Sequence, residues 1–576
     1  MKRGNLRQYI FISIAVMGII GCIALLLPQI RQVFIGIGEQ TIGISLNSDV
    51  WNLLLLSTAL VYLCIIMAFL IIFFSKFEIP QIAQEKKLFI FAIIEIVLIC
   101  LYSCMLIFLA LSSNAIWMDE AYSLSQIRHS WNDLIQLLII DVHPPFYFLV
   151  LKATSLVFGS SITAMKMVSV FPVILLIILV SRFLKKEFSD RAAIFFLLLC
   201  ITSKTITHYS IEIRMYSWAL FFVTLMFVSS WYFLKSGRKH WWAAVLLCAL
   251  GSAYTHNYAA VGAGIVYLFL FLYALKNKKD KIVSMVLLAV FGIILYLPWF
   301  PSLIGQFTRV SDNFWINPLS ILYFFQYVYT VFSTGNYFVS LFLCFMFGYI
   351  SVLFFIRKNN TEKQSFLFGG LCCAVLLVLI GIFISIIIRP LFVARYLVPM
   401  CGLVYLFFAV ECSVIDKRRI TVFIYVVLIS IGIMSFSLSA RKEIKENRDF
   451  NIFYLYFTGK IQQDDTFIFY PPSDTGSLHI VGIIGYLFPD NIYTVYNVSI
   501  SPNTLFSKLW GDTYTEYEDN IFHDRRTWIF VMEEEKSNTR NSNYIQQEIK
   551  GELSGSFGWD SYRFRLYRRN LPDTTP

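Results

Sequence analysis

Charged residues are scarce in this chain of 576 residues, since Asp, Glu, Lys and Arg make up 14% of it and hydrophobic residues 58%. Its mean hydropathy is +0.68. Soluble domains carry about 25% charged residues, so this composition excludes an ordinary soluble protein. The apolar residues form repeated runs of about 20, the length with which a helix crosses a bilayer. Alternating ten-residue segments typical of membrane barrels are not seen. We therefore predict an all-α polytopic membrane bundle.

The cysteines are equally restricted in their positions. All eleven lie inside apolar runs, and none lies in the last 160 residues. This pattern indicates neither a disulfide framework nor the ligand spacing of a zinc site. The polar C-terminal part also lacks a phosphate-binding glycine motif, an HExxH pair and a nucleophile elbow. We therefore expect the chemistry to lie in the apolar part of the chain.

The net charge of +11 can be used to thread the chain through the bilayer, because Lys and Arg collect on the cytoplasmic side. The N-terminal MKRGNLRQYI and the following apolar residues lack a small-residue cleavage site, which favours a retained first span. The predicted spans are 9–27, 52–74, 88–112, 163–183, 191–207, 214–234, 241–255, 258–275, 282–300, 337–356, 365–388, 396–415 and 420–439. These thirteen crossings predict a cytoplasmic N-terminus and an extracytoplasmic C-terminus.

Two apolar segments are predicted not to cross. Residues 143–159 are short for a span, and crossing there would put four basic residues on the wrong side, so they are expected to lie in the outer interface. Residues 319–333 are predicted to form an interfacial or re-entrant helix after an external loop at 301–318.

The chain divides into three predicted regions. Residues 1–87 hold two N-terminal transmembrane helices, 88–440 form the membrane core, and 441–576 form an extracytoplasmic soluble domain. The tail is rich in Asp, Glu, Asn, Tyr and Ser and predicts a small α/β domain. Its β-rich runs are DTFIFYPPS, HIVGIIGYLF, NIYTVYNV, RTWIFVMEE and YRFRLYRR.

Several polar phrases reach the outer face in this topology. They are WMDEAYS (117–123), DVHPPFY (141–147), HYSIEIRMY (208–216), THNY (255–258) and RPLFVARY (389–396). Each phrase alone has a structural interpretation, as a solvated helix end, a proline-initiated helix or an arginine that reaches the headgroups. Together they place carboxylates beside arginines and histidines near headgroup depth, where charges usually have a partner or a task. Arginine suits a phosphate, and a carboxylate can accept a proton from a hydroxyl.

The order WMDEAYS, DVHPPFYFLVLK, IEIRMYSW, HNYAA and ARYLVPM resembles the bacterial family 39 and ArnT-like glycosyltransferases of GT-C type, which are related to protein O-mannosyltransferases. The resemblance runs from about residue 88 to 415. It implies a GT-C fold whose large first external loop contains juxtamembrane helices. It also implies transfer, with inversion, of a sugar from a polyprenyl-phosphate donor to a hydroxyl of a lipid, glycan or protein, on the outer face of a bacterial plasma membrane.

The resemblance also implies roles for particular residues. Asp119 would be the base, Glu120 would orient the site, and Glu212 would be the second acidic position. Arg214 and Arg395 would bind the donor phosphate. The expected substrate-binding residues are Asp141, His143, Tyr147, His256 and Tyr258. A divalent metal ion held by Glu120 and His256 is left open, and no nucleic-acid partner is expected.

Three other functions predict different features. A transporter or flippase predicts charges at mid-span and an inverted repeat, neither of which is seen. A polymerase or ligase of surface polysaccharide would also act on the outer face, but the early DE pair followed by HPP is not its hallmark. A surface interaction protein anchored by its spans would not need thirteen crossings.

Overall fold

The computed structural model describes residues 84–309, 321–357, 360–387, 392–462, 465–470, 476–488, 492–495, 514–516, 526–532, 552–558 and 564–569. The predicted spans 9–27 and 52–74 lie outside these ranges. The remaining eleven predicted spans each contain a helix. In the described part, nine helices are long and apolar enough to cross a membrane, and a bent pair makes a tenth. The predicted all-α membrane bundle is confirmed.

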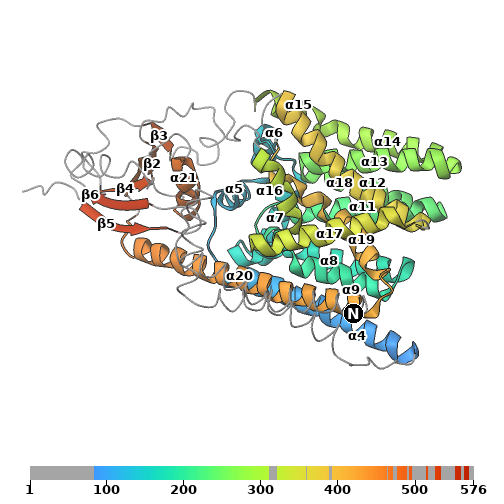
Figure 1. The fold of residues 1–576 in the computed structure, drawn as a ribbon. Helices are drawn as coiled ribbons and strands as arrows, with labels where there is room; N and C mark the ends of the chain where they lie inside the picture. Colours follow the sequence, from blue (N-terminus) through green and yellow to red (C-terminus); the bar gives the residue numbers. More distant parts are fainter. Residues whose placement is uncertain are drawn as a thin grey trace, which may run out of the picture.

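Eight long helices make up most of the bundle (Figure 1). They are α4 (Gln84–Ser112), α8 (Ile162–Glu187), α11 (Tyr216–Ser236), α13 (Asn257–Asn277), α17 (Tyr337–Ile356), α18 (Glu362–Ile387), α19 (Val398–Ser413) and α20 (Arg418–Thr458). The segment that contains α19 is the most enclosed, since 89% of its apolar window is buried, against 17% for α4. Burying α19 and leaving apolar side chains of α4 exposed fits a bundle whose periphery faces lipid.

The predicted span 241–255 contains α12 (Lys239–Thr255), which has seventeen residues. Its links to α11 and α13 are two residues and one residue long, and it packs against both helices. Such short links require it to run antiparallel to its neighbours. Gly237 ends α11 with a φ of 64°, the left-handed conformation that glycine adopts most easily.

The predicted span 191–207 is broken. Helix α9 (Asp190–Thr202) and helix α10 (Lys204–Ile211) meet at Ser203 with a bend of 69°. Ser203 causes the restart locally, because its hydroxyl accepts a hydrogen bond from the backbone N–H of Ile206 at 3.1 Å. The bend turns α10 towards the end of the bundle where the polar phrases gather.

Short helices cover that end. Helices α5 (Met118–Gln126), α6 (Trp131–Ile140) and α7 (Phe146–Phe158) follow α4, and α7 is too short to be a candidate span. Helix α16 (Ile321–Phe332) likewise matches the predicted interfacial or re-entrant helix. Short helices are therefore present where juxtamembrane helices were predicted, and their location on the outer side of the membrane stays a prediction.

The prediction of a loop at 301–318 is wrong in its first part. Helix α14 (Ile282–Tyr296) continues through the 3₁₀ turn Leu297–Trp299 into helix α15 (Phe300–Arg309). Pro298 and Pro301 do not prevent this, because proline is tolerated in the first turn of a helix, which is where both of them lie. Residues 310–320 lie outside the described residues.

A mixed six-stranded sheet lies beyond the bundle, at the far end of α20 (Figure 1). The strands are β1 (Thr466–Tyr470), β2 (Ile492–Val495), β3 (Tyr514–Glu516), β4 (Thr527–Met532), β5 (Glu552–Phe557) and β6 (Phe564–Arg569), in the order β3-β2-β1-β4-β6-β5. Strands β1 to β4 pair in parallel, with Thr466 opposite both Ile492 and Thr527, and β6 pairs antiparallel with β4 and β5. Helix α21 (Gly476–Leu487) joins β1 to β2.

The β-rich run predicted at HIVGIIGYLF is therefore wrong, because these residues form α21. The reason is topological. Parallel strands need a crossover connection, usually a helix, and this apolar segment is the one between β1 and β2. Short apolar runs do not distinguish strand from helix by periodicity alone.

Helix α20 runs through residue 440 without a break and packs on the sheet at its end. The ring of Phe457 lies 5.2 Å from Trp528 and 5.5 Å from Phe467. The composition changes at 440 while the secondary structure does not, so the boundary between 88–440 and 441–576 stays a prediction.

Candidate active site

Helix α5 presents the two adjacent carboxylates. Asp119 and Glu120 lie in its first turn, where the helix dipole favours negative charge. The Glu120 carboxylate accepts hydrogen bonds from the backbone N–H of Trp117 at 3.2 Å and of Ile213 at 2.9 Å. Burial raises the pKa of Glu120 above its ordinary value. Glu120 therefore fastens the start of α5 to the loop that carries Glu212 and Arg214.

The other end of α5 is held by Lys152 of α7. Its ammonium group donates to the carbonyl oxygens of Ile127, at 3.0 Å, and of His129. A cation is favourable at the carbonyl end of a helix. Lys152, the charge that interrupts the apolar run 143–159, thus fixes the position of α5 instead of facing solvent.

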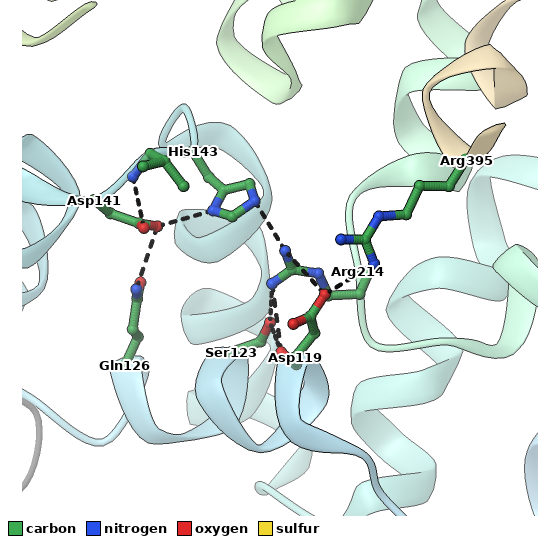
Figure 2. A network of polar contacts seen from close by, with 8 residues as sticks. Asp119, Ser123, Gln126, Asp141, His143, Arg214 and Arg395 are labelled. Atoms are coloured by element: carbon green, nitrogen blue, oxygen red, sulfur yellow. Dashed lines mark hydrogen bonds and ion pairs between the residues drawn. The ribbon is translucent and has the colours of Figure 1, made fainter. Parts of the chain in front are cut away.

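Arg214 is buried, and its guanidinium lies over the part of α5 that carries Asp119 and Ser123 (Figure 2). Its guanidinium donates to the hydroxyl of Ser123 at 3.2 Å and lies 3.7 Å from Oδ2 of Asp119. It also contacts Nε2 of His143 at 2.9 Å. With an exposed fraction of 2%, Arg214 is placed to hold the carboxylate of Asp119 in position.

Arg395 approaches Asp119 from a different helix. It belongs to the 3₁₀ turn Ala394–Leu397, before α19, and its Nη1 lies 3.3 Å from Oδ2 of Asp119. Its guanidinium also lies over the Trp117 ring, 5.8 Å from the ring centre. Arg395 is partly exposed and borders a cavity. Of the two arginines, Arg395 is thus the one with access to a ligand.

Asp141, His143 and Arg214 form a chain of polar contacts (Figure 2). Oδ2 of Asp141 lies 3.2 Å from Nδ1 of His143 and 3.5 Å from the amide nitrogen of Gln126. Burial raises the pKa of Asp141, but His143 and the N–H of Val142 outweigh it and hold that pKa below its usual range. Because a guanidinium only donates, Nε2 of His143 accepts from Arg214 and its Nδ1 donates to Asp141.

Glu212 lies between α10 and α11 and is 4% exposed. Neither of its carboxyl oxygens has a hydrogen-bond partner in the part of the chain that the structure describes. Burial, and then the nearby Glu120 and Asp119, raise the pKa of Glu212 to about 8. It is therefore protonated at neutral pH and borders the same cavity as Arg395.

Three predicted substrate-binding residues have structural contacts. The Tyr147 hydroxyl bonds to Ser169 at 3.1 Å, and Ser169 in turn donates to the backbone oxygen of Arg214. His256 caps α13 by accepting from the N–H of Tyr258 at 3.1 Å. Tyr258 stacks on Tyr396, next to Arg395, at 4.6 Å between ring centres. Their substrate contacts stay a prediction.

The metal hypothesis does not fit these residues. Both oxygens of Glu120 accept backbone N–H groups, and Nδ1 of His256 accepts another. Among the described residues, no group of three or more His, Cys, Asp or Glu side chains could hold a metal ion. We therefore derive no step through a metal.

A cavity of about 180 Å³ lies beside Glu120, Glu212 and Arg395. Its walls include residues that the sequence did not single out as ligands, among them Lys166 of α8 and Glu443 of α20. His208, seen in the sequence only as part of a polar phrase, also lines it. The signal for Lys166 was a lysine near the start of a predicted span, a depth at which charges usually have a task.

Comparisons with known proteins support the resemblance. Residues 142–302 match the family described as dolichyl-phosphate-mannose-protein mannosyltransferase. A search of curated proteins gives no significant match. Among similar solved structures, ArnT from Cupriavidus metallidurans in the apo state has 11% identity and a TM-score of 0.57, covering 82% of this chain and 97% of that chain. The same enzyme bound to undecaprenyl phosphate has 11% identity, a TM-score of 0.56 and the same coverage. The predicted GT-C fold is confirmed.

Proposed function

We propose that this protein is an integral membrane glycosyltransferase that moves a sugar from a polyprenyl-phosphate donor to a hydroxyl acceptor. The observation that carries the proposal is the carboxylate of Asp119 beside two guanidinium groups, 3.7 Å from Arg214 and 3.3 Å from Arg395, next to a cavity. A carboxylate to accept a proton and arginines to hold a phosphate are the two requirements of this reaction.

The donor class follows from the arginines and from the fold. Residues Asp119, Arg214 and Arg395 leave a net positive charge that suits the single negative charge of a polyprenyl-phosphate sugar. A guanidinium has five N–H donors, so Arg395 can bind phosphate while keeping its contact with Asp119. The solved ArnT structure of the same fold contains undecaprenyl phosphate, which supports a lipid-phosphate donor here.

The chemistry is a single displacement. The acceptor oxygen attacks C1 of the sugar while the bond from C1 to the phosphate oxygen breaks, and the bonding electron pair leaves with the polyprenyl phosphate. Asp119 accepts the acceptor's proton, and Arg395 stabilises the charge that develops on the phosphate. One displacement inverts C1 and forms no covalent enzyme intermediate. The acceptor hydroxyl would belong to a lipid, a glycan or a protein.

The site would face the outside of a bacterial plasma membrane. The positive-inside rule orients α4 towards the outside at Ser112 and places the C-terminal sheet on the same side. Cysteine labelling from each side of the membrane tests this orientation. Residue 480 should react from outside and residue 279 from inside.

The decisive experiment offers purified protein radiolabelled polyprenyl-phosphate sugars together with Asp119→Asn. Loss of a general base should lower transfer by roughly 10²- to 10⁴-fold. Asp280→Asn is a matched control, because Asp280 lies at the other end of the bundle and is exposed. Undiminished transfer by Asp119→Asn would remove Asp119 from the role of base.

A further inference from the structure

The cavity beside Asp119 is built by five parts of the chain that are distant in sequence. They are the link into α5, the start of α8, the end of α10, the 3₁₀ turn before α19 and the middle of α20. The polar residues that matter here are Glu120, Lys166, His208, Glu212, Arg395 and Glu443. The cavity measures about 180 Å³. A single water molecule needs roughly 10 to 15 Å³ of such space, so the cavity has room for a much larger group, such as one sugar ring.

The carboxyl group of Glu212 points to a ligand in this cavity. It is 4% exposed, and neither oxygen has a partner among the described residues. A buried polar group without a partner costs about 1–3 kcal/mol, and native proteins contain few of them. A ligand with hydroxyl groups in the cavity would satisfy both oxygens.

The opposite wall is a preformed pair from α8 and α20. Lys166 is 2% exposed, donates to the carbonyl oxygen of Ser113 at 2.8 Å, and lies 4.0 Å from Oε2 of Glu443. This distance is the outer limit of an ion pair, so the carboxylate of Glu443 keeps the capacity to accept hydrogen bonds from a ligand. Helix α20, which leads to the C-terminal sheet, thereby contributes directly to the cavity.

The charges of the lining favour an uncharged ligand. The cations Lys166 and Lys442 face the carboxylates of Glu120, Glu443 and Glu446, and Lys442 is paired with Glu446 at 3.3 Å. Arg395 also borders the cavity, but its charge is paired with Asp119. Glu212 is neutral at neutral pH, because burial raises its pKa to about 8. This lining gives a phosphate or a sugar acid no net attraction, whereas a wall of donors and acceptors suits hydroxyl groups.

We propose that this cavity is the subsite for the uncharged sugar of the donor, and that Glu443 and His208 determine which sugar is accepted. The proposal rests on the proposed function. Arg395 connects the two, since it contacts Asp119 and borders the cavity. The anomeric carbon is one oxygen atom away from phosphorus, so a phosphate bound by Arg395 delivers its sugar into the adjoining space.

The test measures binding, which is independent of turnover. Dissociation constants are determined for undecaprenyl phosphate and for undecaprenyl-phosphate carrying glucose, galactose, mannose or glucuronic acid. The wild-type protein should bind one neutral sugar donor at least tenfold more tightly than the bare lipid phosphate, and the glucuronic acid donor should gain nothing. Glu443→Gln and His208→Gln should each reduce that preference by about tenfold and leave binding of the bare lipid phosphate within about twofold. Glu552→Gln, an exposed residue of β5, is the matched control.

Three other outcomes overturn parts of the account. Equal weakening of the bare lipid phosphate and the sugar donor by Glu443→Gln and His208→Gln would make the cavity part of the phosphate site. Unchanged donor binding with a raised KM for the acceptor would assign the cavity to the acceptor's terminal sugar and refute the proposal. A wild-type protein that binds neither lipid phosphate nor sugar donor would refute the proposed function itself. Two variants on different helices guard against one that does not fold.

Discussion

The two ends of the bundle both bury charged groups, but they do so in different ways. At the end opposite Asp119, the 2% exposed Glu187 side chain lies 3.0 Å from Lys235 and 3.2 Å from Lys363. Glu411 there lies 3.1 Å from Arg357 and accepts from Gln364 at 3.0 Å. We call these six residues the closed cluster. The groups at the other end, Asp119, Glu212, Arg214 and Arg395, are the Asp119 cluster.

The two clusters differ in whether their carboxyl groups have partners and in whether a cavity lies beside them. In the closed cluster each carboxylate has two partners, and the residues come from the ends of α8, α11, α18 and α19 and, for Arg357, from the position just after α17. In the Asp119 cluster Glu212 has no hydrogen-bond partner among the described residues, and a cavity lies beside it. Both clusters are buried, so burial does not distinguish them. The Asp119 cluster differs in having an unsatisfied group beside a cavity, which favours the role proposed for it.

The largest expected contrast comes from truncating one arginine at each end. Arg395→Ala should weaken binding of polyprenyl phosphate by about 10- to 150-fold, the value of about 1.5–3 kcal/mol for a hydrogen bond to a charged group. Arg357→Ala should leave that affinity unchanged and instead lower stability, because Glu411 loses a charged partner. Isothermal titration and thermal unfolding of both variants measure the two effects. Unchanged donor affinity in Arg395→Ala together with lost expression would make Arg395 a structural residue like Arg357.

The pH dependence of stability should differ between two variants, Glu212→Gln in the Asp119 cluster and Glu411→Gln in the closed cluster. The folded state keeps the proton of Glu212 up to a pKa of about 8, whereas an unfolded glutamate loses it near its ordinary value of about 4.3. The folded state thus binds more protons in this window, so Glu212 lowers stability progressively as pH rises through it and has no effect below it. The slope is about 1.4 kcal/mol for each pH unit.

Glu212→Gln should therefore be more stable than the wild type at pH 8 and equally stable at pH 4. Glu411→Gln should be less stable than the wild type at pH 7. The carboxylate of Glu411 accepts a charge-assisted hydrogen bond from Arg357 and another from the amide of Gln364, and a neutral amide would weaken both. Melting temperatures measured from pH 4 to 8 give both results. A Glu212→Gln curve parallel to that of the wild type would mean that Glu212 is ionised and satisfied when folded.

Removing His143, which contacts Arg214, should have a smaller effect on donor affinity than removing Arg395. His143→Ala removes the acceptor for Arg214 and should lower donor affinity by about 2- to 10-fold, the net value of an ordinary hydrogen bond. His143→Gln should restore part of the loss, because an amide can accept from Arg214 and donate to Asp141. The donor dissociation constant is the readout. An effect as large as that of Arg395→Ala would place His143 in contact with the phosphate.

Much of the Asp119 cluster could be predicted from the sequence, for a physical reason. Asp119, Arg214 and Arg395 each lie at the end of an apolar run, and the positive-inside rule assigns all three run ends to one face. This brings Asp119 within 3.3 Å of a residue 276 positions away. The family resemblance then supplied their roles. The sequence could not predict how the two arginines differ, with Arg214 buried and Arg395 at the border of the cavity.

The contribution of α20 to the cavity was not predicted, because the change in composition was interpreted as a domain boundary. The change at residue 440 placed Glu443 in a separate domain, while the helix continues to Thr458. The signal was available, since RKEIKENRDFNIFYLYFT (441–458) contains neither glycine nor proline, and nothing in it ends a helix. Helix α21 was missed because a strand and a short buried helix share the same apolar pattern.

The smallest expected effect on transfer concerns α21 and extends the comparison to the C-terminal domain. Helix α21 packs against α5 (Figure 1), and the guanidinium of Arg128, just after α5, lies 4.1 Å from the ring centre of Tyr486. Such a contact is worth about 0.5–1 kcal/mol at an accessible site. Because α5 carries Asp119, Tyr486→Leu should lower transfer by about 2- to 5-fold. Tyr486→Phe keeps the ring and should retain nearly full activity, as measured by transfer at saturating donor. Equal activity in all three proteins would mean that the C-terminal domain does not help to position α5, and that the Asp119 cluster is held, like the closed cluster, by the bundle alone.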